Sequence, residues 1–284
     1  MNSNYLAQYL VNEGKLTPAE IKPLLADIAA KDPQLPLMAL KLRMLDADAL
    51  KGLDTASSGD FGKDALQKGL LSHDQLQKLH RQMPGETLRF AQALLDGGRM
   101  DFGELQSEFA AYEKASPDPV YSAVEKAAAG QIDDPELYAD YMTLFMDSLV
   151  GFLHTPVVID PEPFVIPNDY FSDNVYEVSQ RIEGDANLVS GMMAKEKEFI
   201  SLAARYSQEE MNEVDDLAVD SMEEFFNVVN GLYCIQLAGK NKETELGLPR
   251  WNKNIAPRGD QQLLLKIHAD LGSFAVVLAA DEFM

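Results

Sequence analysis

The sequence predicts an α+β protein, in which an all-helical N-terminal repeat domain precedes a domain of helices packed on a mainly antiparallel sheet. Two observations lead to this prediction. A short turn-forming pattern recurs within the first 112 residues, as expected of stacked helical hairpins. Beyond residue 135, amphipathic helical segments alternate with short strand-like runs, and the last two of these runs are spaced as a β-hairpin.

The repeated pattern joins a helix-ending glycine, an apolar residue and a helix cap at residues 14–21, 69–76 and 98–105. The glycine can take the left-handed conformation that ends a helix. Three residues later a capping side chain is followed by a Glu or Gln at the capping-box position. The pairs are Thr17–Glu20, Ser72–Gln75 and Asp101–Glu104, and Leu6, Phe61 and Phe90 stand eight residues before the glycines. Residues 45–50 are a candidate fourth, degenerate copy.

This hairpin unit resembles the small N-terminal helical domains of type II secretion and pilus-assembly ATPases. The chain has no Gly-x-x-x-x-Gly-Lys-Ser/Thr phosphate loop, so no ATPase activity is expected. Two roles remain open for the repeats, a protein-docking module and a structural or dimerising appendage. DNA binding is not expected, because the second helices lack a basic, polar reading face.

Breaks in the pattern divide the chain into a repeat domain (1–112), a connector (113–135) and a C-terminal domain (136–284). The connector contains two proline-rich breaks around a short Ala-rich helix, which is typical of a linker. In the C-terminal domain we expect helices at 136–153, 196–206 and 217–237, an extended Pro-rich stretch at 155–166, strands at 175–182, 188–193, 243–248, 262–269 and 274–280, and a turn at 270–273.

Composition narrows the class of protein. The formal net charge is −22, and residues 136–284 hold 26 acidic and 10 basic residues. Such a surface repels nucleic acid and anionic lipid. The chain has one cysteine, four scattered histidines and no apolar run long enough for a membrane span, so we expect no metal site, no disulfide and no membrane segment. A cytoplasmic protein is the expectation, because no signal peptide is recognisable.

The predicted helix at 217–237 carries an unusual polar group. Glu224 and Asn227 are three residues apart and therefore neighbours on a helix. At about 100° per residue, one half of the helix is apolar, with Leu217, Met222, Phe225, Phe226, Val228, Val229, Leu232, Tyr233 and Ile235. The other half is polar, with Asp220, Glu223, Glu224, Asn227, Asn230 and Gly231. Spacing alone is compatible with a functional site or with the solvated face of an amphipathic helix.

The spacing Asp220-x3-Glu224-x2-Asn227, followed after 21 residues by Pro249, resembles the motif of the CheX/CheC/FliY family of response-regulator phosphatases. The order of elements in residues 136–284 is also similar to that family. A single copy of the motif is typical of the CheX type, which implies a homodimer.

The resemblance implies hydrolysis of the aspartyl phosphate on a CheY-like receiver domain, in chemotaxis or related two-component signalling. Asn227 would accept a hydrogen bond from the attacking water through its amide oxygen, and Glu224 would bind a lysine of the receiver. The receiver would supply Mg²⁺, so the chain would need no cofactor of its own.

Other residues have supporting roles in this hypothesis. Asp220 would start the helix or hold Glu224 in place, and the adjacent Glu223 could make the partner contact instead of Glu224. Pro249 and Trp251 would lie in a loop near the motif, where Trp251 is either an interface anchor or part of the core lid. The alternative function is a non-catalytic adaptor that binds a receiver domain or itself.

Overall fold

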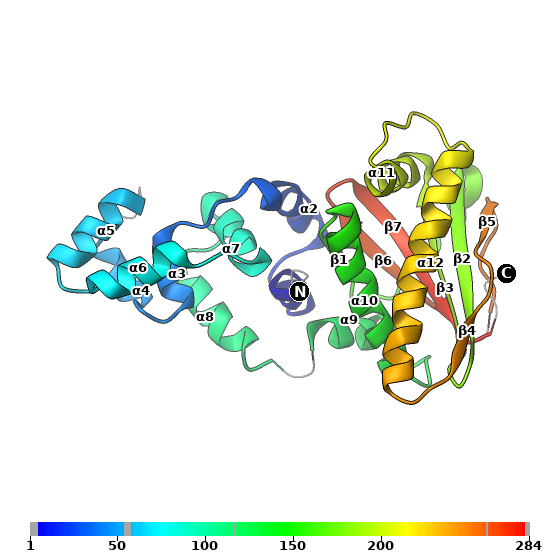
Figure 1. The fold of residues 1–284 in the computed structure, drawn as a ribbon, viewed down its shortest axis with the longest axis horizontal. Coiled ribbons are helices and arrows are strands. Elements are labelled where there is room, and N and C mark those ends of the chain that lie inside the picture. The colour runs from blue at the N-terminus through cyan, green and yellow to red at the C-terminus, as the bar shows by residue number, and fades with distance from the viewer. Residues whose placement is uncertain (1–4, 54–57, 116–117, 260, 282–284) are drawn as a thin grey trace.

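A series of helical hairpins extends from one side of a sheet-containing half (Figure 1). The computed structural model describes residues 5–53, 58–115, 118–259 and 261–281. The helices of the series, which we call the helical array, are α1 (Tyr5–Asn12), α2 (Pro18–Asp27), α3 (Leu35–Lys41), α4 (Ala47–Lys51), α5 (Ser58–Gln67), α6 (His73–Arg81), α7 (Glu86–Asp96) and α8 (Phe102–Tyr112).

The three predicted hairpin turns form as expected from their sequence pattern. Gly14, Gly69 and Gly98 have φ angles of +66°, +67° and +60°, the left-handed region in which glycine meets no Cβ penalty. The capping boxes at Thr17, Ser72 and Asp101 are all present. Leu6, Phe61 and Phe90 are fully buried. Each turn is therefore closed by contacts within about ten residues of chain.

The degenerate copy is a fourth hairpin, formed by α3 and α4. Arg43 stands where the other turns have glycine, and its φ is +56°. The backbone N–H groups of Met44 and Leu45 donate to Ala39 O over 2.9 and 3.3 Å. Asp46 caps α4 by accepting from Ala49 N. The backbone thus repeats the same turn without the glycine.

The sheet-containing half combines α-helices with an antiparallel sheet. The helices are α9 (Pro119–Ala128), α10 (Pro135–Leu153), α11 (Glu196–Ser207) and α12 (Asp216–Gly239). The strands are β1 (Val157–Ile159), β2 (Val175–Gly184), β3 (Leu188–Lys195), β4 (Thr244–Leu246), β5 (Arg250–Lys253), β6 (Leu263–Ala269) and β7 (Gly272–Ala279). The order is β1-β6-β7-β3-β2-β4, β5 also pairs with β2, and every pair is antiparallel.

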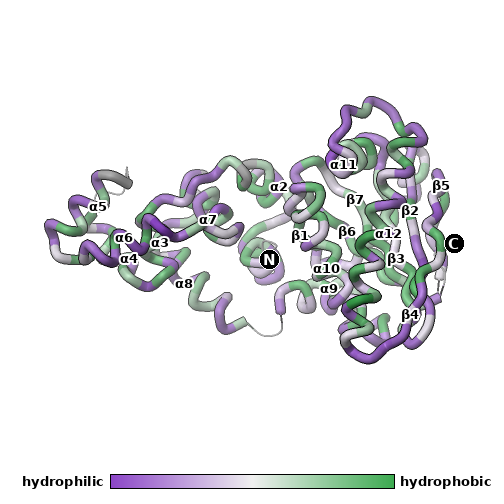
Figure 2. The backbone as a smooth tube through the Cα atoms, viewed as in Figure 1, coloured by the Kyte–Doolittle hydropathy of each residue, from purple (hydrophilic) through white to green (hydrophobic). Residues whose placement is uncertain are grey.

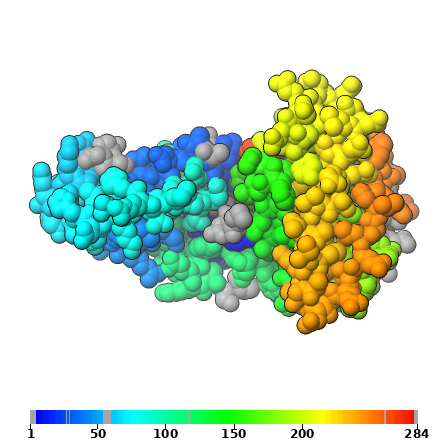
Figure 3. All heavy atoms as spheres, viewed as in Figure 1, coloured from blue at the N-terminus to red at the C-terminus, as the bar shows by residue number. Residues whose placement is uncertain are grey.

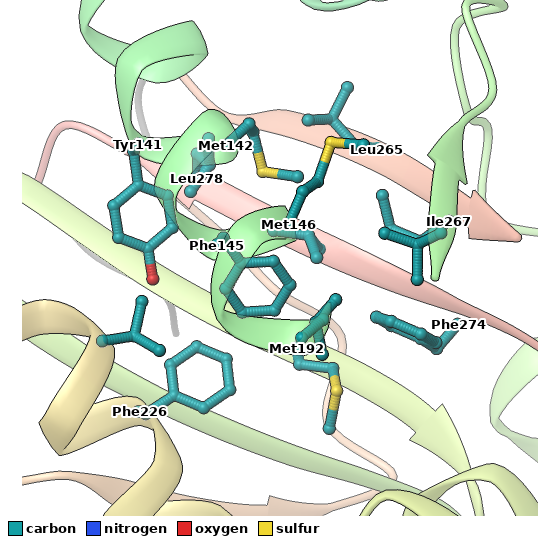
Figure 4. Close-up of a cluster of buried hydrophobic side chains, with 14 of the residues drawn as sticks. Tyr141, Met142, Phe145, Met146, Met192, Phe226, Leu265, Ile267, Phe274 and Leu278 are labelled. Atoms are coloured by element: carbon teal, nitrogen blue, oxygen red, sulfur yellow. The ribbon is translucent and has the colours of Figure 1, made fainter. Parts of the chain in front are cut away.

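The main core lies between one face of this sheet and α10, α11 and α12. Successive side chains of a strand point to opposite faces, so β2 sends Tyr176, Val178 and Ile182 into this core. Figure 4 shows Phe145 of α10 between Phe226 of α12 and the side chains of the sheet. In Figure 2 the central strands β6 and β7 are largely hydrophobic, whereas the segment joining α11 to α12 is largely hydrophilic.

The opposite face of the sheet carries a smaller core. Val175, Met193 and Val277 are buried there, and Phe164 and Tyr170 of the preceding segment pack against them. Covering both faces explains why β3 and β7 are buried along nearly their whole length.

The helical array is joined to the sheet by a buried side chain of α1. Gln8 Nε2 donates to Ile159 O (2.9 Å), and Ile159 N donates to Gln8 Oε1 (2.7 Å). The side-chain amide thereby satisfies the outer edge of β1 as a neighbouring strand would. Asn12 Nδ2 also donates to Pro119 O of α9 over 2.7 Å. We call these contacts the junction.

Two strands differ from the sequence expectation. Within the extended stretch 155–166, residues 157–159 pair with β6, and Pro156 and Pro161 limit this strand because proline cannot donate to a ladder. The segment around Trp251 is the strand β5, not a loop, and pairs with β2. Pro249 separates it from β4.

Among the described residues, no helix is both long and apolar enough to cross a bilayer.

Candidate functional site

The motif lies on α12, and its position follows from the cap and the buried face of that helix. Asp215 caps the helix by accepting from Ala218 N over 3.0 Å. One of our expectations was that Asp220 starts the helix, and this is wrong because Asp215 caps it. Asp220 lies in the second turn, where it is exposed. Met222, Phe225, Phe226, Val229 and Tyr233 are buried against the sheet and α10, so the helix cannot rotate without opening the core.

The buried strip of α12 is narrower and rotated relative to the predicted apolar half. Leu217, Leu232 and Ile235 are 49%, 37% and 70% exposed, which was not expected. Asn230, which we had placed on the polar half, is fully buried. The reason is that the sheet offers Asn230 polar partners, so a buried amide replaces an apolar contact there.

Glu224 and Asn227 are both exposed and adjacent. Asn227 Nδ2 donates to Glu224 Oε2 at 3.5 Å, a long contact that a partner group could replace. Figure 3 shows α12, coloured yellow to orange, on the outer surface of this half. The two side chains therefore lie on the solvent-exposed side of α12.

Glu223 is half-buried beside this pair. Burial raises the pKa of its carboxyl, and the charge of Asp220 raises it further. A second neighbour, Tyr206 of α11, lies close to Glu224: burial raises the pKa of its hydroxyl and the Glu224 carboxylate adds to that shift. Of the two adjacent glutamates, Glu224 is the one that contacts Asn227.

The amide of Asn227 is held from below by the sheet. Gln180 Nε2 of β2 donates to Asn227 Oδ1 (3.0 Å) and to the carbonyl oxygen of Gly247 (2.9 Å). We expected the NH₂ group of Asn227 to be anchored and its oxygen to accept from water; the structure instead anchors the oxygen through Gln180 and leaves the NH₂ at the exposed contact with Glu224. One lone pair of Oδ1 is left for a second hydrogen bond.

Pro249 and Trp251 follow the segment that supplies Gly247. Pro249 is half-buried, whereas Trp251 is 48% exposed and lies opposite Val178 of β2. Leu248 is 85% exposed. The segment reaches the motif through Gly247, whose carbonyl shares the Gln180 amide with Asn227.

Sequence reasoning missed Gln180, and it missed the part played by Asn230. The signal for Gln180 is present in the strand pattern, since it occupies an inward position between Val178 and Ile182. A polar residue at such a position needs a buried partner. That partner cannot be identified from spacing, because it lies 50 residues away on α12.

Within the described ranges there is no group of three or more His, Cys, Asp or Glu residues placed to hold a metal ion.

Comparisons with known proteins give structural matches only. No protein-family model matches the sequence, and no curated protein sequence matches it either. The structure matches chemotaxis protein CheX from Desulfovibrio desulfuricans, with 13% identity, 51% of this chain and 99% of the other chain covered, and a TM-score of 0.41.

Two further matches are of the same kind. The CheX chain in a CheX–CheY–BeF₃–Mg²⁺ complex from Borrelia burgdorferi has 15% identity, covers 53% of this chain and 99% of its own, and gives a TM-score of 0.40. FliY from Thermotoga maritima has 12% identity, 58% and 93% coverage, and a TM-score of 0.37. About half of the chain is thus similar in structure to CheX/CheC/FliY chemotaxis proteins.

Proposed function

We propose that the C-terminal half dephosphorylates the aspartyl phosphate of a CheY-like response-regulator receiver domain, in chemotaxis or related two-component signalling. The observation that carries the proposal is the exposed pair of Glu224 and Asn227, with the amide of Asn227 fixed from the core. A fixed amide beside a carboxylate suits a reaction that needs positioning more than a nucleophile from the protein.

The chemistry follows from the reactivity of the substrate. An acyl phosphate is an activated bond, so hydrolysis needs a water molecule placed in line with phosphorus and stabilisation of the developing charge. Asn227 NH₂ donates to the oxygen of that water, and the remaining lone pair of Oδ1 accepts one of its protons. Glu224 binds an ammonium group of the receiver and sets the register of the two proteins.

In this proposal the receiver supplies Mg²⁺ and the acidic pocket around its aspartyl phosphate, as well as the phosphoryl group. Asp220 and Glu223 form an acidic border to the pair that favours a basic patch on the partner. Pro249 and Trp251 lie on the neighbouring edge of the sheet, and the exposed ring of Trp251 provides an apolar contact.

The proposal extends to the organisation of the protein. We propose a cytoplasmic protein with the division 1–112, 113–135 and 136–284, acting as a homodimer. The helical array then serves as a docking or structural module and takes no part in the reaction.

The test is phosphate release from a purified CheY-type receiver, loaded with acetyl phosphate in the presence of Mg²⁺, on addition of the full chain. We expect acceleration over the receiver alone and a loss of about 100-fold in kcat for Asn227→Ala, the scale of a misplaced reacting group. Glu224→Gln should mainly raise KM. Gln236→Ala, which removes an exposed amide on the same helix, is the matched control and should match the wild type.

Two results would contradict the proposal at different levels. If no CheY-type receiver loses phosphate faster than on its own, the chain is not such a phosphatase, and pull-down of the same receivers then tests the adaptor function. If Asn227→Ala is as active as the wild type, the residue assignment is wrong.

A further inference from the structure

A continuous chain of hydrogen bonds runs from the sheet to the exposed motif. Ser190 Oγ of β3 donates to Asn230 Oδ1 (3.0 Å), Asn230 Nδ2 donates to Gln180 Oε1 (2.8 Å), and Gln180 Nε2 donates to Asn227 Oδ1 (3.0 Å). Ser190, Asn230 and Gln180 are 0%, 0% and 2% exposed. Buried amides of this kind are costly unless every polar atom has a partner.

One backbone carbonyl fixes which end of each side-chain amide faces its neighbour in this series of hydrogen bonds. Gly247 O can only accept, so the atom of Gln180 that faces it at 2.9 Å must be the donor Nε2. Gln180 Oε1 then faces Asn230 and requires a donor there, which leaves Asn230 Oδ1 toward the Ser190 hydroxyl. The same donor Nε2 requires an acceptor on Asn227. A reversed amide at any step would place two acceptors or two donors together.

We propose that Gln180 is the positioning residue of the site, and that it sets the polarity of Asn227 with the oxygen inward and the NH₂ outward. Gln180 is 2% exposed and does not touch the partner itself. It acts by removing the freedom of an exposed amide to rotate and present either of its ends. The cost of ordering Asn227 is then met during folding instead of during the encounter with the substrate.

A direct test follows the side-chain NH₂ of Asn227 by NMR in the full-length protein labelled with ¹⁵N-asparagine. Asn227→Ala identifies the signal by its loss. In the wild type we expect two well-separated proton shifts and a rigid NH₂ group. In Gln180→Leu the two shifts should move toward those of a free asparagine amide, with a lower heteronuclear NOE.

The matched control is Gln92→Leu, which removes another buried glutamine amide, one bonded within the helical array to Gln34 N and Asp96. It should leave the Asn227 signal unchanged. An unchanged Asn227 signal in Gln180→Leu would overturn the proposal. So would an equal response to Gln92→Leu, because the effect would then be one of general stability.

Gln180→Glu provides a second variant that keeps the size of the side chain. A carboxylate would face Gly247 O and Asn227 Oδ1 with no proton to donate, whereas the protonated acid restores one donor. The Asn227 signal should therefore return toward the wild-type position as the pH is lowered. A pH-independent signal in this variant would contradict the role of the Nε2 donor.

A kinetic arm rests on the proposed function. With the phosphorylated CheY-type receiver, Gln180→Leu should lower kcat at least 10-fold and change KM less than twofold. In the Asn227→Ala background the same substitution should have no further effect, because its target is gone. An equal loss in both backgrounds would overturn the positioning role. If the wild type itself is inactive, the proposed function fails, and the NMR result alone decides the role of Gln180.

Discussion

The helical array and the sheet-containing half differ in how far apart in the sequence their structure-determining contacts lie. In the array, each turn is closed by a cap and backbone bonds within a few residues, such as Lys15 N to Leu10 O. In the other half, the bonds that position the motif join residues 40–67 apart. A hairpin turn of the array can therefore recur wherever its short sequence pattern recurs. The hydrogen bonds that position the motif form only when the sheet and α12 have packed together.

The junction is where the two kinds of structure meet, and breaking it should have the largest effect. Gln8→Leu leaves the N–H and C=O of Ile159 without their partners at a buried strand edge. We expect a loss of about 3 kcal/mol in the free energy of unfolding. Helical circular dichroism should then change at lower denaturant than the fluorescence of Trp251, the only tryptophan.

Gln92→Leu is the control for this prediction, since it breaks bonds inside the array and spares the junction. If the wild type unfolds as one unit, both probes should shift together in that variant. Coincident transitions in Gln8→Leu would show that the junction does not couple the two halves.

A buried carboxyl gives the sheet-containing half its own pH dependence. Glu177 of β2 is 1% exposed; its Oε1 accepts from Ile255 N over 3.1 Å, and its Oε2 has no hydrogen-bond partner among the described residues. Burial raises its pKa to about 7, while the hydrogen bond from Ile255 opposes that shift. The folded state therefore holds this proton at pH values where the unfolded chain has released it.

Because the folded state binds the Glu177 proton more tightly than the unfolded chain, raising the pH destabilises the protein. The contribution of Glu177 to the free energy of unfolding is greatest below its unfolded pKa, declines as the pH rises from about 4.5 to about 7, and is then constant. Glu177→Gln should remove this slope and stabilise the protein by about 2 kcal/mol at pH 8. Urea unfolding at pH 5 and pH 8 measures it. Glu183→Gln, which alters an exposed glutamate on the same strand, should keep the wild-type slope.

The contrast in range also explains how much the sequence could predict. The caps at Thr17, Ser72 and Asp101 and the left-handed glycines are local signals, and all were predicted. So were the strands that make up most of β2, β3, β6 and β7, because apolar residues run through β3, β6 and β7 and recur along β2.

The polarity of Asn227 could not be predicted, because it depends on a backbone carbonyl at Gly247 and on Gln180, which are brought together only by the fold. The burial of Asn230 was missed for the same reason. Periodicity places a residue on a helix face, but the side chains that the sheet offers decide which part of that face is covered.

The smallest effect is expected from exchanging the turn residues of the array, where Arg43 replaces the glycine of the other turns. Arg43→Gly should stabilise the protein by about 0.5 kcal/mol, since it relieves a left-handed residue with a Cβ but adds freedom to the unfolded chain. The ion pair that Arg43 makes with Glu113 is largely exposed and contributes little. The reciprocal variant is Gly69→Ala, where φ is +67° and an added Cβ meets nothing within 4 Å. It should cost about 0.5 kcal/mol, because the backbone strain of the added Cβ outweighs the reduced freedom of the unfolded chain. Urea unfolding of the two variants measures both changes in the free energy of unfolding. A stabilising Gly69→Ala would refute the equivalence of the four turns.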